Sequence, residues 1–169
     1  STLASSQGNW LRTDIHSNTG LVFNNEVNFR LVSSFIDTKD NSKDTNKIIF
    51  YPQIASKISY PLRRIDSNTI MTLTPIIMPI IAPYNNYTEA QAVNSSNVFS
   101  HNRESSLYLW ESGPRVNYGI EWFLSHENNI DARISLAQTA KINKEKSDVS
   151  DEISDYVLSS SISLSSDKY

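Results

Sequence analysis

The charged residues with the most suggestive spacing lie between positions 103 and 115. Arg103 precedes Glu111 by eight residues, and Arg115 follows Glu111 by four. Two guanidinium groups near one carboxylate can form charge-assisted hydrogen bonds, which are stronger than hydrogen bonds between neutral groups. The sequence therefore favours a charge network that orders the segment 97–119. The alternative is three independent solvated charges.

Residue patterns that support catalysis or metal binding are not evident. His16, His101 and His126 lie in separate polar segments without a partner at ligand spacing, so we expect solvated loop positions. The glycines are too scattered for a phosphate-binding loop, and no nucleophile elbow accompanies the serines. The absence of cysteine excludes thiol catalysis and cysteine-based zinc sites. We therefore expect no enzymatic activity, no metal and no cofactor.

The composition does not suit a soluble domain with a thick core of its own. Hydrophobic residues make up 38% of the 169 positions, below the roughly 45–50% that is usual in globular proteins. No apolar run reaches the ~18 residues of a membrane-spanning helix. The net charge is −3, and no cluster of Lys and Arg stands out. The sequence thus argues against a helical membrane protein and against a nucleic-acid-binding surface.

Alternation of apolar and polar residues is the dominant pattern. Residues 21–35 place most apolar side chains on odd positions and polar side chains on even positions, which indicates a half-buried strand. The alternation recurs along the chain, and a further strand around 105–112 brings the expected number to about seven. The six clearest strands are 21–35, 48–62, 70–82, 116–124, 134–142 and 156–164. Because no helical crossover joins them, the predicted fold class is all-β, an antiparallel meander.

Several local features are expected to make this meander irregular. The stretch 70–82 is apolar on both faces and contains Pro75 and Pro79, which predicts an edge-like or bulged strand. A long polar loop is expected at about 83–106. Gly113 and Pro114 predict a turn, and Gly119 within a strand marks a bulge or the close approach of another chain segment.

The length of the strands indicates whether water or lipid surrounds them. Several alternating runs last about 11–15 residues, whereas strands in soluble proteins usually have about 5–6. An outer-membrane barrel needs about 9–11 tilted residues per strand, apolar toward lipid and polar toward a wet lumen. We therefore favour such a barrel over the alternative, a soluble or surface-exposed β-sandwich binding module. In the barrel, the expected lumen-facing residues are Asn24, Glu26, Asn28, Arg30, Gln53, Lys57, Arg115, Asn117, Glu121 and Arg133.

The stretch NVFSHNRESSLYLWESGPRVNYG, from Asn97 to Gly119, resembles a segment of the LptD family, also called organic solvent tolerance protein. The departures from the family pattern are at 104 and 106–109, in the connecting turn. The resemblance extends over roughly residues 47–166. The residues that match the family pattern in register are Asn97, Phe99, Ser100, Asn102, Arg103, Ser105, Glu111, Gly113, Arg115, Asn117, Tyr118 and Gly119.

The resemblance implies a function in lipopolysaccharide assembly. LptD-like barrels insert lipopolysaccharide at the surface of the Gram-negative outer membrane. The resemblance therefore implies lipopolysaccharide as cargo, outer-membrane lipid as surroundings, and an LptE-like plug lipoprotein and the periplasmic Lpt bridge as partners, with no nucleic acid. The matched motif would form a structural, luminal loop. Because seven strands cannot close so wide a lumen, we expect residues 1–169 to be a partial barrel domain, incomplete at both ends.

Overall fold

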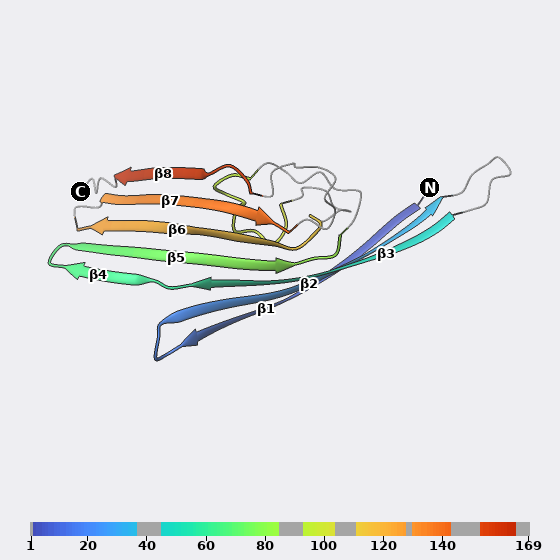
Figure 1. Cartoon of the computed structure of the whole chain (residues 1–169), viewed down its shortest axis with the longest axis horizontal. Helices are drawn as coiled ribbons and strands as arrows, with labels where there is room; N and C mark the ends of the chain where they lie inside the picture. Colours follow the sequence, from blue (N-terminus) through green and yellow to red (C-terminus); the bar gives the residue numbers. More distant parts are fainter. Residues whose placement is uncertain are drawn as a thin grey trace, which may run out of the picture.

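The computed structural model describes residues 2–36, 45–84, 93–103, 111–127, 130–142 and 153–164. Its strands form one eight-stranded antiparallel sheet (Figure 1). The strands are β1 (Thr2–His16), β2 (Leu21–Ile36), β3 (Thr45–Ser59), β4 (Leu62–Asp66), β5 (Thr69–Ile81), β6 (Arg115–His126), β7 (Ile130–Lys141) and β8 (Val157–Leu164).

The strand order in the sheet follows the chain. It runs β1-β2-β3-β5-β6-β7-β8, with β4 paired to β5, so the predicted all-β antiparallel meander is confirmed. The connections after β1, β4 and β6 are short and lie at one end of the sheet (Figure 1). Apart from the short connection between β3 and β4, the remaining connections, after β2, β5 and β7, are longer, and the ends of these three strands lie at the other end of the sheet. Within the described residues, no helix is long and apolar enough to span a membrane.

The strands differ from the sequence prediction mainly in two places. The sequence did not predict β1, whose residues from Thr2 to His16 all pair with β2. Its alternation is weak because Gly8, Arg12 and Asp14 occupy positions where the other strands carry apolar side chains. The predicted strand 48–62 is divided between β3 and β4 at Tyr60. Of the expected strand around 105–112, residues 104–110 lie outside the described part of the chain.

The prediction that 70–82 is an edge-like or bulged strand was wrong, because β5 lies between β3 and β6 and keeps a constant register with its neighbours on both sides. The carbonyl of Pro75 accepts a hydrogen bond from the Tyr60 backbone N at 3.1 Å, so the side of Pro75 that lacks an N–H faces β3 and β4. The side of Pro79 that lacks an N–H faces the same neighbours, because the backbone orientation of a strand repeats every two residues. The ladder to β6 is therefore unbroken from Thr69 to Ile80. A central strand tolerates these prolines because only one of its two ladders is interrupted.

The register gives the sheet two chemically different faces, since cross-strand partners share a face. All of the expected lumen-facing residues, from Asn24 on β2 to Arg133 on β7, lie on the same face, which we call the polar face. The opposite face, here the apolar face, carries most of the exposed large hydrophobic side chains. Examples are Phe29, Phe50, Ile54, Ile77, Ile120, Ile134, Leu158 and Ile162, of which Ile162 is 75% exposed.

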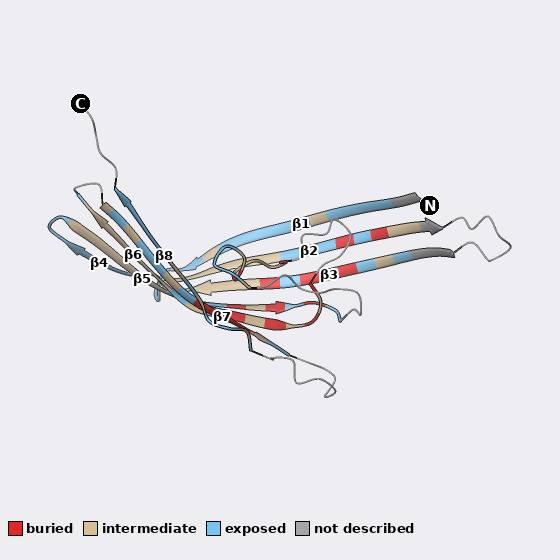
Figure 2. Cartoon of the chain, turned by 90° about the horizontal axis from the view of Figure 1, so that it is seen from above, coloured by how far each residue is buried: buried red, intermediate tan, exposed pale blue. Residues whose placement is uncertain are grey.

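Burial is concentrated in one half of the sheet. Figure 2 shows the buried residues in the half of the strands that lies toward the longer connections. The small hydrophobic core there consists of Ala55, Met78 and Ile80, which belong to the polar face. The segments that cover this part of the polar face come from the connection between β5 and β6.

Candidate functional site

The segment 93–103 lies against the polar face and is anchored by apolar contacts. Phe99 packs on the core of Ala55, Met78 and Ile80, and Val98 is buried. The Lys57 ammonium lies 5.1 Å from the centroid of the Phe99 ring, a cation–π arrangement. The segment therefore covers the part of the polar face in which apolar side chains interrupt the polar ones. We call residues 93–103 the covering segment.

A tight turn shapes the start of this segment. The Asn94 side-chain oxygen accepts hydrogen bonds from the backbone N of Ser96 at 3.0 Å and of Asn97 at 3.2 Å. In return, the Asn97 side-chain oxygen accepts a hydrogen bond from the Asn94 backbone N at 2.8 Å. Such side-chain bonds to nearby backbone favour turns over strands. The turn directs Val98 and Phe99 toward the sheet.

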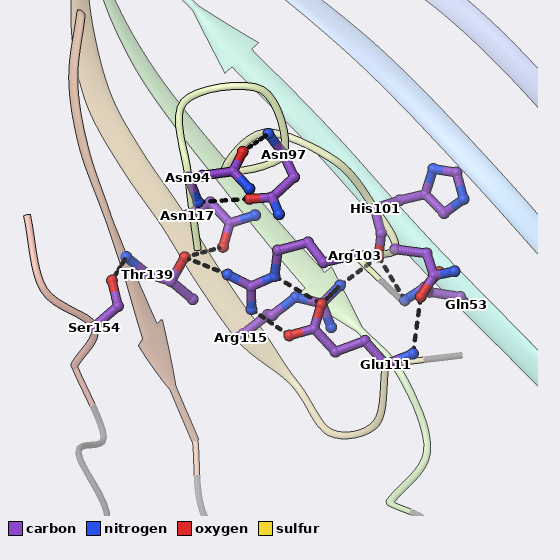
Figure 3. A network of polar contacts seen from close by, with 11 residues as sticks. Gln53, Asn94, Asn97, His101, Arg103, Glu111, Arg115, Asn117, Thr139 and Ser154 are labelled. Carbon is purple, nitrogen blue, oxygen red and sulfur yellow. Dashed lines mark hydrogen bonds and ion pairs between the residues drawn. The ribbon is translucent and has the colours of Figure 1, made fainter. Parts of the chain in front are cut away.

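Arg103, Glu111 and Arg115 form a buried charge network (Figure 3). Arg103 Nε donates to Glu111 Oε2 at 2.8 Å, and Arg103 Nη2 donates to the other carboxylate oxygen. Arg115 Nη2 lies 3.1 Å from Glu111 Oε2, and all three side chains are at most 1% exposed. A two-pronged guanidinium–carboxylate pair fixes both distance and orientation. The three charges that the sequence singled out are thus brought together.

This network continues into β6 and β7. Arg103 Nη1 donates to the Thr139 hydroxyl at 3.0 Å, and that hydroxyl donates to Asn117 Oδ1 at 3.0 Å. The Thr139 backbone N donates to the Ser154 hydroxyl at 2.9 Å. The network therefore joins the covering segment to two strands of the sheet and to the residues that precede β8.

A second branch reaches β3 through the backbone of His101. The His101 carbonyl accepts hydrogen bonds from Gln53 Nε2 at 2.8 Å and from Arg115 Nη2. The His101 ring nitrogen Nδ1 lies 3.1 Å from Glu26 Oε1. The expectation that His101 is a solvated loop residue was therefore wrong. The other two histidines end strands β1 and β6.

The electrostatic balance keeps Glu111 ionised. Burial raises the pKa of its carboxyl, but the Arg103 hydrogen bond and the positive charges of Arg115, Arg103 and Lys141 outweigh burial, so the net pKa is lowered. Among the described residues, no group of three His, Asp or Glu side chains could hold a metal ion. The arrangement positions a segment of chain on the sheet.

The motif residues divide between this network and its surroundings. Asn102 joins the network, since its side-chain oxygen accepts a hydrogen bond from the Glu111 backbone N at 2.8 Å. Gly113 has φ 80° in the predicted turn, and its N donates to the Pro83 carbonyl at 3.0 Å. The Ser100 backbone N donates to the Asn97 carbonyl at 2.9 Å. Ser105 lies outside the described residues.

Two motif residues stand apart from the network. Tyr118 is on the apolar face, where its hydroxyl donates to Gln138 Oε1 at 2.5 Å. Gly119 lies against β7, and a Cβ there would meet the Leu136 carbonyl oxygen at 2.4 Å and Ala137 Cα at 2.8 Å. The close approach of another segment, which the sequence suggested for Gly119, is therefore confirmed.

Sequence reasoning missed Thr139 and Ser154 as members of the network, and it did not connect Gln53 with His101. Thr139 sits opposite Asn117 across the β6–β7 ladder. Because their contact depends on the register of that ladder, the sequence held no local signal for it. Gln53 was assigned to the correct face, but its partner lies 48 residues away.

Comparison with known proteins identifies the family. The family model LptD, described as LPS transport system D, matches residues 11–168. Searches of curated proteins and of solved structures give no significant match. The matched range begins within β1 and continues past β8, so it includes the charge network and the covering segment. Because the match extends over almost the whole sequence, the chain belongs to the LptD family.

Proposed function

We propose that this chain is part of the wall of an outer-membrane β-barrel that inserts lipopolysaccharide at the cell surface. The observation that carries the proposal is the LptD match over residues 11–168. This range includes the strands β2 to β8 and the end of β1, which belong to a single two-faced sheet. The family description, LPS transport system D, names lipopolysaccharide as the cargo. The apolar face of the sheet would keep such a protein in a bilayer.

The dimensions of the strands support the membrane wall. Apart from β4 and β8, the strands have 12 to 16 residues, more than the roughly 9–11 that cross an outer membrane. Their apolar face is exposed along its length, with Phe50 57% and Ile54 51% exposed. A face of this kind is costly in water and favourable in lipid. The apolar face would therefore lie against outer-membrane lipid.

The distribution of connections supports an orientation. Outer-membrane barrels have short turns on the periplasmic side and longer loops outside. The short connections after β1, β4 and β6 would then face the periplasm. The charge network of Arg103, Glu111 and Arg115 would hold a luminal loop in the outer half of the barrel.

Residues 1–169 would form a partial barrel domain. In the described sheet, β1 and β8 do not pair with each other, so each has a free edge to which further strands can add. A barrel with more strands has a wider lumen. Such a lumen would hold the family's plug lipoprotein, and the periplasmic Lpt bridge would deliver lipopolysaccharide from the periplasmic side.

The β-sandwich binding module is less well supported. In a sandwich the apolar face would be covered by a second sheet. The described strands all belong to one sheet, and the apolar face carries no second layer built from them.

Controlled depletion of the full-length protein in its cell tests the proposed function. The readout is the amount of newly made lipopolysaccharide that an antibody reaches on intact cells, with total lipopolysaccharide as the reference. We expect the surface fraction to fall on depletion and to recover when the wild-type protein is supplied again. Unchanged surface lipopolysaccharide in depleted cells would refute the function.

A further inference from the structure

The junction between β3 and β5 is short and interrupted. Its residue pairs lie at positions 54–55 and 58–59 of β3, and positions 56–57 between them have no pair in the described sheet. The ladder between β2 and β3, in contrast, runs without a gap from Val22 to Ile36. β3 also continues past the end of β5, so its residues 45–53 have no ladder partner on that side among the described strands (Figure 1). We call this junction the seam.

The prolines of β5 account for the gap. In an antiparallel strand, the N–H and C=O groups of one residue point to the same neighbouring strand, and successive residues alternate between the two neighbours. The Pro75 carbonyl accepts a hydrogen bond from the Tyr60 backbone N, so Pro75 and Pro79 occupy positions whose N–H would donate to β3. Proline has no N–H, and the register places Ser56 opposite Pro79. The Ser56 carbonyl therefore receives no hydrogen bond from Pro79, and few backbone hydrogen bonds join the half of the sheet made of β1–β3 to the half made of β4–β8.

The covering segment lies across the seam on the polar face. The Phe99 ring packs on the cluster that Ala55 of β3 forms with Met78 and Ile80 of β5. The Lys57 ammonium, also from β3, lies 5.1 Å from the centroid of the ring. Lys57 is one of the two β3 residues in the gap of the ladder. One aromatic side chain thus packs over both strands at the place where their backbones are not joined.

Polar contacts of the same segment also reach both halves of the sheet. The His101 carbonyl accepts hydrogen bonds from Gln53 Nε2 of β3 at 2.8 Å and from Arg115 Nη2 of β6 (Figure 3). The His101 ring nitrogen Nδ1 lies 3.1 Å from Glu26 Oε1 of β2, in the same half as Gln53. Arg115 belongs to the other half, where Glu111 fixes it. His101 therefore links β2 and β3 to β6 across the seam.

We propose that the covering segment is a strap that holds the seam closed, and that β3 separates from β5 when the segment leaves the polar face. Side-chain contacts of the strap replace the backbone hydrogen bonds that the prolines remove. Because the segment contacts both halves at once, its docking and the closure of the seam stabilise each other. The seam lies inside the sheet, away from the free edges of β1 and β8. This coupling is a property of the sheet alone and does not depend on the proposed function.

Amide hydrogen exchange at single residues of β3 can follow the seam in the full-length protein in detergent. By the alternation of a strand, the N–H groups of Ile54, Ser56 and Ile58 face β5, whereas those of Ala55 and Lys57 face β2. Mass spectrometry with fragmentation of the peptide separates the two sets. Exchange of the amides that face β5 reports opening of the seam, and exchange of the amides that face β2 reports loss of the β2–β3 ladder.

Two variants release the strap by different means. Glu111→Gln removes the counter-charge of Arg103 and Arg115, and Phe99→Ala removes the apolar anchor without leaving a buried charge. We expect the amides that face β5 to exchange about tenfold faster or more in both variants, as loss of contacts worth one hydrogen bond implies. The amides that face β2 should stay at the wild-type rate. Glu121→Gln, on the polar face of β6 and away from the network, should change neither set. If Glu111→Gln does not fold, Phe99→Ala decides.

A rescue variant tests the part played by the proline. Pro79→Val supplies an N–H opposite the Ser56 carbonyl, so in the Glu111→Gln background it should slow exchange of the amides that face β5 by about tenfold. Exchange of the segment 93–103 should stay faster than in the wild type. Unchanged exchange of the amides that face β5 in a folded Glu111 or Phe99 variant would overturn the strap. An equal rise in the amides that face β2 would also overturn it, because β3 would then unfold as a whole, and so would failure of Pro79→Val to slow exchange.

Discussion

Replacing Glu111 with glutamine should release the covering segment 93–103 from the polar face. Glu111 is the single anion between Arg103 and Arg115, and the side chains of all three are at most 1% exposed. The substitution leaves two buried guanidinium groups without a counter-charge. Removal of one partner from a buried ion pair costs about 3–5 kcal/mol. Since the charges are fully buried, solvent screening does not reduce this cost.

Amide hydrogen exchange of the peptide 93–103, measured by mass spectrometry on the full-length protein, reports this release. Exchange of a docked segment follows the population of its open form. At about 1.4 kcal/mol per tenfold, the expected cost raises that population by roughly a hundredfold to a few thousandfold. Glu121→Gln is the matched control, because Glu121 lies on the polar face of β6, the strand that carries Arg115, and away from the network. If Glu111→Gln exchanged at the wild-type rate, the network would not be what holds the segment.

Four further outcomes follow from the same contacts. Arg115→Ala should loosen the segment less, by about 1–3 kcal/mol, because the Arg103–Glu111 pair stays neutral; trypsin cleavage after Arg103 should rise, though less than in Glu111→Gln. The lowered pKa of Glu111 means that the network stabilises the fold above the ordinary glutamate pKa and fails only as pH falls through the lower, folded-state pKa. The difference in thermal midpoint between the wild type and Glu111→Gln should accordingly shrink in strong acid, and a constant difference would contradict this. Phe29→Lys, in the middle of β2 on the apolar face, should cost about 2–4 kcal/mol in lipid and Asn24→Lys less than about 1 kcal/mol, as urea unfolding in vesicles would show. Gly119→Ala should cost about 1–3 kcal/mol, because its Cβ would meet the Leu136 carbonyl oxygen at 2.4 Å, while Ser125→Ala on the same face of β6 should leave the unfolding midpoint nearly unchanged.

Much of the fold was predictable because one local signal, alternation, determines both strand position and face. Residues 21–35 and 116–124 became β2 and β6, with the polar residues on the expected side. The same signal failed for β1, where Gly8 and Arg12 stand on the apolar face. It also failed to predict the central position of β5 in the sheet. The sequence of a strand does not reveal with which of its two neighbouring strands a proline interrupts the hydrogen-bond ladder.

The site was less predictable because its contacts join distant segments. Arg103, Glu111 and Arg115 are close in sequence, so their charges suggested a network. Thr139 and Gln53 are brought in only by the strand register and by the path of the covering segment.

The central claim is that the apolar face meets lipid and the polar face meets a water-filled lumen. The chain has no cysteine, so nitroxide labels can be attached at single introduced cysteines in the full-length protein in vesicles, with any cysteine elsewhere replaced. We predict that labels at Val27, Phe29 and Leu31 collide mainly with oxygen, which concentrates in lipid. Labels at Asn24, Lys57 and Glu121 should collide mainly with a water-soluble nickel complex. If labels on the apolar face were shielded from both reagents, that face would be packed against protein and the barrel-wall account would be wrong.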